Sequence, residues 1–226
     1  MTENYVVIIT TAREYYALHS WLEAMEQKEA VLNWIKLGRV TPPFTENIKL
    51  VPGDRVCYHI DMDEEVTWNV SVPANISVVF IGSSTVVHHR GNIEAHEHAH
   101  VKCRLFNERG VLPQTPGTVV LRDQSSLETL DMLNVGTHVI AHDFVTWRSH
   151  GGMDVRADGC TRGWAANSTV QLDGNAAATA SFASSIRADG NSVVWTQDPS
   201  MVEVVGLGAH VQTVGDLFGE TDSFDD

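Results

Sequence analysis

The sequence predicts a mainly β protein, a β-solenoid of about eight-residue repeats with a small α+β cap at its N-terminal end. Two observations lead to this prediction. Between residues 84 and 205 an apolar residue recurs about every eight positions, and the residues around it alternate between apolar and polar. Short turns rich in glycine, asparagine and aspartate separate these stretches. A period of eight is too short for a strand plus a helix, so it fits one short strand and one tight turn.

The alternation assigns the two faces of each strand. Because side chains two positions apart share a face, we expect Val155 and Ala157 to point inward and Arg156 to point outward. The same argument places Ile186 and Ala188 inside. The inward residues are small or of medium size, which predicts a narrow core between stacked coils.

The spacing of the turns bears on the length of one coil. Asn175 and Asn191 lie sixteen residues apart, as do Gly174 and Gly190, so two octads per coil would stack them at one corner. Three octads per coil is the alternative. An antiparallel sandwich of short strands is a further alternative, which the even spacing disfavours.

The N-terminal segment has a different pattern. A β-branched strand at 5–10 is followed by a capping box at 11–14 and by an amphipathic helical pattern that ends at Gly38. Residues 48–51 and 55–60 flank a Pro-Gly-Asp turn and predict a hairpin.

These patterns divide the chain into three parts. Residues 1–81 form an α+β capping segment, residues 82–205 the solenoid, and residues 206–226 a C-terminal cap with an acidic tail. Within the solenoid, residues 106–117 contain two prolines and predict a protruding loop or irregular coil.

The segments Gly91-Asn-Ile-Glu-Ala-His and Ser168-Thr-Val-Gln-Leu-Asp-Gly-Asn resemble the Gly-Asn-Ala-Thr-Val-x-Ala repeats of bacterial and phage octapeptide-repeat β-solenoid proteins. The resemblance covers roughly half of the chain. It implies the solenoid fold and a bacterial or phage origin. Such repeats have no common activity, so the resemblance assigns no functional residue.

Charge and cysteine content restrict the classes of partner and the compartment. The formal net charge is −14, with −5 in residues 1–81, −4 in residues 82–205 and −5 in residues 206–226. Direct nucleic-acid binding is disfavoured because the solenoid has no basic patch. No stretch is long enough to cross a membrane. Three cysteines without Cys-x-x-Cys spacing indicate reduced thiols and a cytoplasmic protein.

Aromatic residues of the later repeats are the candidate partner-binding residues. They are Trp147, Trp164 and Trp195, together with Arg148. Tryptophan and arginine are enriched at binding hot spots. Trp164 and Trp195 lie near inward positions of the repeat, and Trp147 is compatible with either face. Filling of the narrow core is therefore an equally weighted alternative role for these rings.

A histidine cluster is the candidate metal site: His88, His96, His98 and His100. The repeat places His96 and His100 on the outside and His98 on a corner, which favours surface histidines over a tetrahedral set of ligands. His142, His150 and Asp158 form a second set, spaced by eights.

The leading hypothesis is a non-catalytic β-solenoid without a cofactor that presents a rigid surface to a protein partner, as a phage or mobile-element inhibitor or structural component. Stacked ends also allow a homodimer. The alternative is an enzyme or metal- or ligand-binding protein with a histidine-containing cleft. That cleft would lie between the N-terminal segment and the first coils, where it is lined by Trp68, His88, Glu94 and His96. Mimicry of DNA would need dense acid along the coils, which the solenoid's net −4 disfavours.

Overall fold

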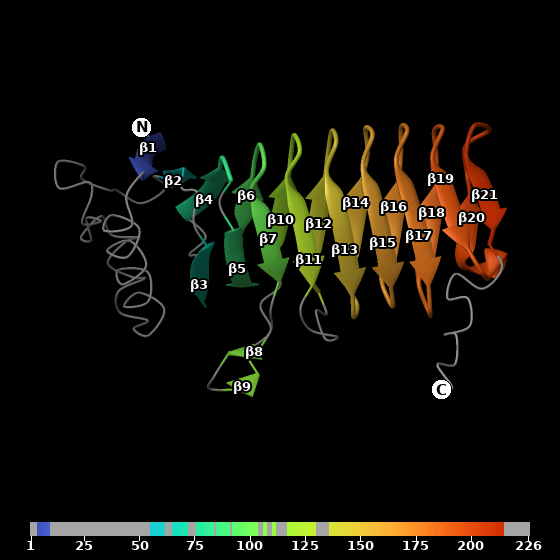
Figure 1. The fold of residues 1–226 in the computed structure, drawn as a ribbon, viewed down its shortest axis with the longest axis horizontal. Coiled ribbons are helices and arrows are strands. Elements are labelled where there is room, and N and C mark those ends of the chain that lie inside the picture. Colours follow the sequence, from blue (N-terminus) through green and yellow to red (C-terminus); the bar gives the residue numbers. More distant parts are fainter. Residues whose placement is uncertain are drawn as a thin grey trace, which may run out of the picture.

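The computed structural model is an elongated stack of β coils (Figure 1). It describes residues 4–9, 55–61, 65–71, 76–83, 85–90, 92–103, 106–107, 110–111, 117–129 and 136–214. The helical pattern expected between residues 11 and 38 lies outside these ranges, as does the first arm of the hairpin expected at 48–51.

Two parallel sheets form the opposite walls of the solenoid in the described part of the chain. The ten-strand sheet contains, in spatial order, β1 (Asn4–Ile9), β2 (Arg55–Asp61), β4 (Ile76–Ile81), β6 (Ile93–Ala95), β10 (Thr118–Leu121), β12 (His138–Ala141), β14 (Asp154–Ala157), β16 (Thr169–Leu172), β18 (Ser185–Ala188) and β20 (Val202–Val204). The nine-strand sheet contains β3 (Glu65–Ser71), β5 (Thr85–Arg90), β7 (His100–Cys103), β11 (Ser126–Thr129), β13 (Thr146–His150), β15 (Arg162–Ala166), β17 (Ala177–Ser181), β19 (Val193–Thr196) and β21 (His210–Thr213).

Each coil contributes one strand to each sheet, so the coil of two octads is confirmed. Val155 pairs with Val170, Val170 with Ile186 and Ile186 with Val202, which gives coils of 15 or 16 residues. The pairing is parallel throughout both sheets, which excludes the antiparallel sandwich. The offset of 15 or 16 residues between paired strands excludes three octads per coil in these late coils.

The two edges of the solenoid differ in regularity. Corners of four residues join the ten-strand sheet to the nine-strand sheet at 96–99, 122–125, 142–145, 158–161, 173–176 and 189–192. The connections at the opposite edge vary in length. The longest contains the antiparallel pair β8 (Phe106–Asn107) and β9 (Gly110–Val111), so the sequence correctly predicted an interruption there (Figure 1). A short 3₁₀ turn, Pro199–Met201, lies on the same edge between β19 and β20.

The predicted inward and outward positions of the late coils are confirmed. Val155 and Ala157 are buried and Arg156 is exposed, and Ile186 and Ala188 are buried on either side of exposed Arg187. Stacking continues these positions along the whole solenoid into one core of mostly Val, Ala, Leu and Ile. Large and small residues alternate down the column Phe80, Ala95, Leu121 and Ala141, so adjacent coils interdigitate.

One large side chain enters this narrow core. Trp147 on β13 is 2% exposed and points inward, and its register partner on β15 is Gly163. A Cβ atom at Gly163 would lie 1.9 Å from Cε2 of the indole, so the ring occupies the space that a side chain would need. Ala141 and Ser149, which belong to the same coil as Trp147, are also small and buried.

Every four-residue corner contains one left-handed residue at its second position, with φ between 55° and 68°. Glycine occupies this position in the late coils as Gly159, Gly174 and Gly190, and the predicted stacking of the last two is confirmed by the 2.7 Å from the Cβ position of Gly190 to the Gly174 amide. The earlier coils use acidic residues instead: Glu97, Asp123 and Asp143.

Both sheets continue beyond the predicted boundaries of the solenoid. On the N-terminal side β2 pairs in parallel with β1 and with β4, so 55–60 does not pair there as an antiparallel hairpin arm. On the C-terminal side β21 pairs in parallel with β19, so 210–213 extends the nine-strand sheet.

Candidate functional site

The outer face of the nine-strand sheet carries the candidate partner-binding residues. Arg148 pairs in register with Trp164, Trp164 with Thr179 and Thr179 with Trp195. These residues therefore form one column across four neighbouring strands. The column is the outward one, because the residues on either side of it along each strand belong to the core-facing columns. The expectation that Trp164 and Trp195 lie near inward positions was therefore wrong.

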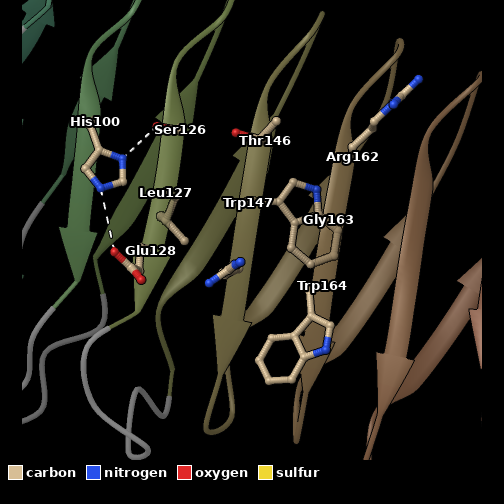
Figure 2. Close-up of a pocket in the computed structure, with 10 residues that line it drawn as sticks. His100, Ser126, Leu127, Glu128, Thr146, Trp147, Arg162, Gly163 and Trp164 are labelled. Atoms are coloured by element: carbon tan, nitrogen blue, oxygen red, sulfur yellow. Dashed lines mark hydrogen bonds and ion pairs between the residues drawn. The ribbon is translucent and has the colours of Figure 1, made fainter. Parts of the chain in front are cut away.

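A hollow of about 510 Å³ lies on this face beside Trp164. Its lining comes from four adjacent strands (Figure 2): His100 of β7, Ser126, Leu127 and Glu128 of β11, Thr146, Trp147 and Arg148 of β13, and Arg162, Gly163 and Trp164 of β15. The small side chains of Ser126 and Thr146 leave space between longer neighbours. The hollow is thus open to solvent and has aromatic, cationic and hydroxyl groups within reach of a bound side chain.

We call Arg148, Arg162, Trp164 and Trp195 the Trp–Arg face. Both arginines are exposed, and neither guanidinium forms an ion pair or hydrogen bond within the described residues. The Trp164 ring lies 6.0 Å from the His150 ring, centroid to centroid, and Nε1 of Trp195 donates to Oε1 of Gln212 at 2.7 Å. The tryptophans are held in place while the arginines keep their hydrogen-bonding capacity for another molecule.

Glu128 is the acidic residue that lines the hollow, and it already has a partner. Its carboxylate lies 3.8 Å from Nε2 of His100, whose Nδ1 lies 2.6 Å from the Ser126 hydroxyl. The lining thus includes two exposed arginines and one carboxylate that is within reach of a histidine, and the Arg162 side chain extends away from Glu128 (Figure 2). The hollow is locally cationic in a chain whose formal net charge is −14.

Trp147 does not belong to the surface, which corrects its assignment as a partner-binding residue. Its 2% exposure leaves the ring inaccessible to a partner except at the floor of the hollow. Its Nε1 is buried and has no hydrogen-bond partner among the residues that the structure describes. The reason for the difference is register: Trp147 and Trp164 are seventeen residues apart, whereas β13 and β15 pair at an offset of sixteen, so the two rings point to opposite faces.

Arg162 is the residue that sequence reasoning missed. It precedes Trp164 by two positions on β15, and side chains two apart on a strand share a face. This spacing was visible in the sequence. Recognising it required the knowledge that Trp164 points outward.

The four histidines of the candidate metal site lie at different places in the fold. His88 on β5 has register partners Trp68 and Cys103 in the nine-strand sheet. His96 and exposed His98 belong to the first corner. His100 lies on the outer face of the nine-strand sheet beside Ser126.

The proposed cleft is not assembled as expected either. Trp68 and His88 belong to the nine-strand sheet, whereas Glu94 lies on β6 of the ten-strand sheet and His96 follows it at the corner. Glu94 Oε1 lies 3.1 Å from Nε2 of His96 and accepts a 2.8 Å hydrogen bond from Nε of Arg122. His96 Nδ1 lies 3.2 Å from Asp123 Oδ2. The cluster is a mixed network of charges across two coils.

The environment of Asp123 favours its charged form. A hydrogen bond from the Glu97 amide lowers the pKa of the Asp123 carboxyl below its ordinary value of 3.8. Burial, the second-largest effect, raises the pKa of this carboxyl, and the hydrogen bond from His96 and the charges of His96 and Arg122 lower it further.

Two members of the second histidine set come together. Nδ1 of His142 lies 2.8 Å from Oδ1 of Asp158 in the next coil, while His150 lies at the far end of β13 beside Trp164. Among the residues that the structure describes, no three His, Cys, Asp or Glu side chains converge as metal ligands would. The described segments also include no helix long and apolar enough to span a membrane.

No protein-family model, curated protein or solved structure matches this chain.

Proposed function

We propose that this β-solenoid is a non-catalytic interaction protein that binds a protein partner through the Trp–Arg face. The observation that carries the proposal is Trp164, half-buried at the rim of a hollow of about 510 Å³ whose lining also includes Arg148 and Arg162, two exposed residues that have no ion-pair partner in the described residues. Aromatic and arginine side chains around a pocket are the usual anchors of protein interfaces.

The scaffold suits this role because it is rigid. Each outward side chain extends from a strand that is paired on both sides and anchored by a buried neighbour. A partner therefore meets preorganised groups, which lowers the entropic cost of association. The exposed arginines favour an acidic segment, since guanidinium groups bind carboxylates bidentately.

The proposal is tested by affinity capture with two matched variants. In the first, Trp164→Thr is combined with Arg148→Ala and Arg162→Ala, where threonine is the residue already present one strand further along the column. In the second, Arg156→Ala and Arg187→Ala remove the same two charges from the outer face of the ten-strand sheet. Circular dichroism establishes that both variants are folded.

We expect one stoichiometric protein to be captured from a bacterial lysate by the wild type and by the Arg156/Arg187 variant, and lost from the Trp164 variant. Metal analysis accompanies the same purified sample. Equal capture by all three proteins would exclude the Trp–Arg face as the binding surface. A stoichiometric transition metal with no protein partner would favour the alternative function.

That alternative is an enzyme or metal- or ligand-binding protein that uses the histidines near the first coils. Its support is the network of Glu94, His96 and Asp123. Replacing His88 and His96 by alanine separates the two functions. Loss of an activity or of bound metal in a folded protein supports the histidine site, whereas unchanged partner capture supports the interaction protein.

The proposal extends to location and biological role. We place the protein in the cytoplasm, where it acts as a phage or mobile-element inhibitor or structural component. Buried Cys103, whose pKa burial raises to about 12, and exposed Cys160 are both free thiols, which suits a reducing compartment. Assay of the captured partner's activity with and without the purified solenoid tests inhibition, and cell fractionation tests location.

Self-association through the C-terminal end is the remaining part of the proposal. β20 and β21 are the last strands of their sheets within the described residues, and Val204 and Leu207 nearby are strongly exposed. Such an edge can pair with a second copy. Sedimentation of the wild type against Val204→Lys measures this: a dimer that the lysine dissociates supports it, and a monomeric wild type contradicts it.

A further inference from the structure

The chain continues for twelve residues beyond Val214, and their composition complements the Trp–Arg face. Residues 215–226 contain five acidic residues and no basic residue. The same twelve residues include Leu217, Phe218 and Phe224. This combination of carboxylates and aromatic rings matches a hollow lined by two arginines and a tryptophan.

The segment is long enough to reach this face from its own chain. β21 is separated from β15 by β19 and β17, so three strand spacings of ~4.8 Å, about 14 Å in all, lie between its end and Trp164. The strand of Arg148 is one spacing further. An extended chain advances ~3.4 Å per residue, so the nine residues from Val214 to Ser223 span up to about 30 Å.

Attachment to the same chain makes even a weak contact effective. A short flexible tether gives a local concentration on the order of millimolar, so docking requires only modest affinity. Pairing of carboxylates with the two guanidinium groups and burial of a phenylalanine ring in the hollow both contribute to that affinity. The hollow of about 510 Å³ has room for one aromatic side chain with its neighbours.

We infer that the C-terminal segment 215–226 docks on the Trp–Arg face of its own chain and occupies the hollow beside Trp164. A partner with an acidic segment then competes with this tail for the same arginines. The inference rests on the proposed function for its regulatory meaning, but docking itself is measurable without any partner.

The test is paramagnetic relaxation enhancement in the full-length ¹⁵N-labelled protein. A nitroxide is attached at Ser223→Cys, which leaves Phe224 and all five acids of the tail in place. Exposed Cys160 is first replaced by serine, and the Cys160→Ser protein treated with the same reagent corrects for labelling elsewhere. We expect the amides of β13 and β15 to be broadened most strongly, and those of β14 and β18 on the opposite sheet to be spared.

Charge variants show whether the arginines hold the tail. Arg148→Ala with Arg162→Ala should remove most of the broadening at β13 and β15, and Arg156→Ala with Arg187→Ala should leave it unchanged. Neutralising the tail in the full-length chain, with Asp216, Asp222, Asp225 and Asp226 changed to Asn and Glu220 changed to Gln, should have the same effect as the first pair. Raising the salt concentration to about 1 M should weaken the broadening, because charges separated by more than ~3 Å are then screened.

Other patterns overturn the inference. Strongest broadening at β20 and β21 would mean that the tail caps the end of the solenoid, and absence of structured broadening would mean that it does not dock. Broadening that appears only when ¹⁵N-labelled protein is mixed with an unlabelled, spin-labelled copy would make the occupant a second molecule. If the tail docks but the affinity capture finds no partner, only the proposed function is contradicted and the inference on the tail stands. If the capture depends on Trp164 and no docking is seen, only the inference on the tail falls.

Discussion

The early coils, residues 93–150, and the late coils, residues 154–196, build the same corner with different chemistry. In the early coils the left-handed residue is acidic, and a carboxylate bonds the coil before it: Asp123 Oδ2 accepts from the Glu97 amide and Asp143 Oδ2 from the Asp123 amide. In the late coils the left-handed residue is glycine, and at two of the three corners the aspartate just before it accepts its amide: Asp173 does so for Gly174 and Asp189 for Gly190.

The comparison identifies what the corner requires. It needs a residue that tolerates positive φ, and it needs an acceptor for the amide at that residue. Glycine meets the first requirement without steric strain, so a preceding aspartate is free to meet the second. In the early coils a left-handed acidic residue strains the backbone. Hydrogen bonds between its amide and a carboxylate of the next coil offset part of this cost. The sequence repeat is therefore clear in the late coils and degenerate in the early ones, although the corners of both groups have the same backbone conformation.

The largest effect is expected where the two groups of coils meet, at Trp147 and Gly163. Gly163→Ala places a methyl group inside the indole ring, and overpacking of this kind should lower the free energy of unfolding by ~3 kcal/mol. Chemical denaturation measures the change. Adding Trp147→Leu, the residue type that Leu127 supplies at the preceding position, should restore most of the loss. A neutral Gly163→Ala would show that the ring does not occupy this space.

Opposite substitutions at equivalent corners should change the free energy of unfolding in opposite directions. In Gly190→Ala the new Cβ would lie 2.7 Å from the Gly174 amide nitrogen at a left-handed φ of +63°, so we expect a loss of ~2 kcal/mol. Glu97→Gly removes a strained side chain while the backbone amide still donates to Asp123, so we expect a gain of up to ~1 kcal/mol. Thermal unfolding measures the change in stability of both variants relative to the wild type. Two changes in the same direction would contradict this account of the corners.

The smallest effect concerns the carboxylate ladder of the early coils. Asp123→Asn should lower stability at neutral pH by ~0.5 kcal/mol, since the carboxylate is largely exposed. The folded-state pKa of Asp123 lies below its ordinary value of 3.8, so the contribution of its charge is present above pH 3.8 and is lost as the pH falls through the folded-state value. The difference in stability between the wild type and Asp123→Asn, taken from denaturation curves, should therefore disappear as the pH falls from neutral to acid. A difference that stays constant with pH would mean that the shape of the side chain, and not its charge, causes the effect.

The site illustrates how far the sequence pattern reaches. Tryptophan and arginine content drew attention to strands that line the hollow, where Arg148 and Trp164 lie together, and their role in partner binding stays a prediction. The pattern left the face of Trp147 open and placed Trp164 near an inward position, whereas Trp147 points into the core and Trp164 points outward. A coil of 15 residues lies among coils of 16 without a marker in the sequence, and a shift of one residue turns a side chain from the core to solvent.

By itself, the sequence determined the solenoid, the inward residues of the late coils and the interruption near residue 106, and it left two or three octads per coil open. These follow from local alternation and from turn residues, which act within a few positions along the chain. Only the tertiary structure decided that one sheet extends to β1 and the other to β21, that the histidines belong to different strands and a corner, and that Arg148, Arg162 and Trp164 line one hollow. Those features depend on the register between coils, because stacking brings together residues fifteen or more positions apart.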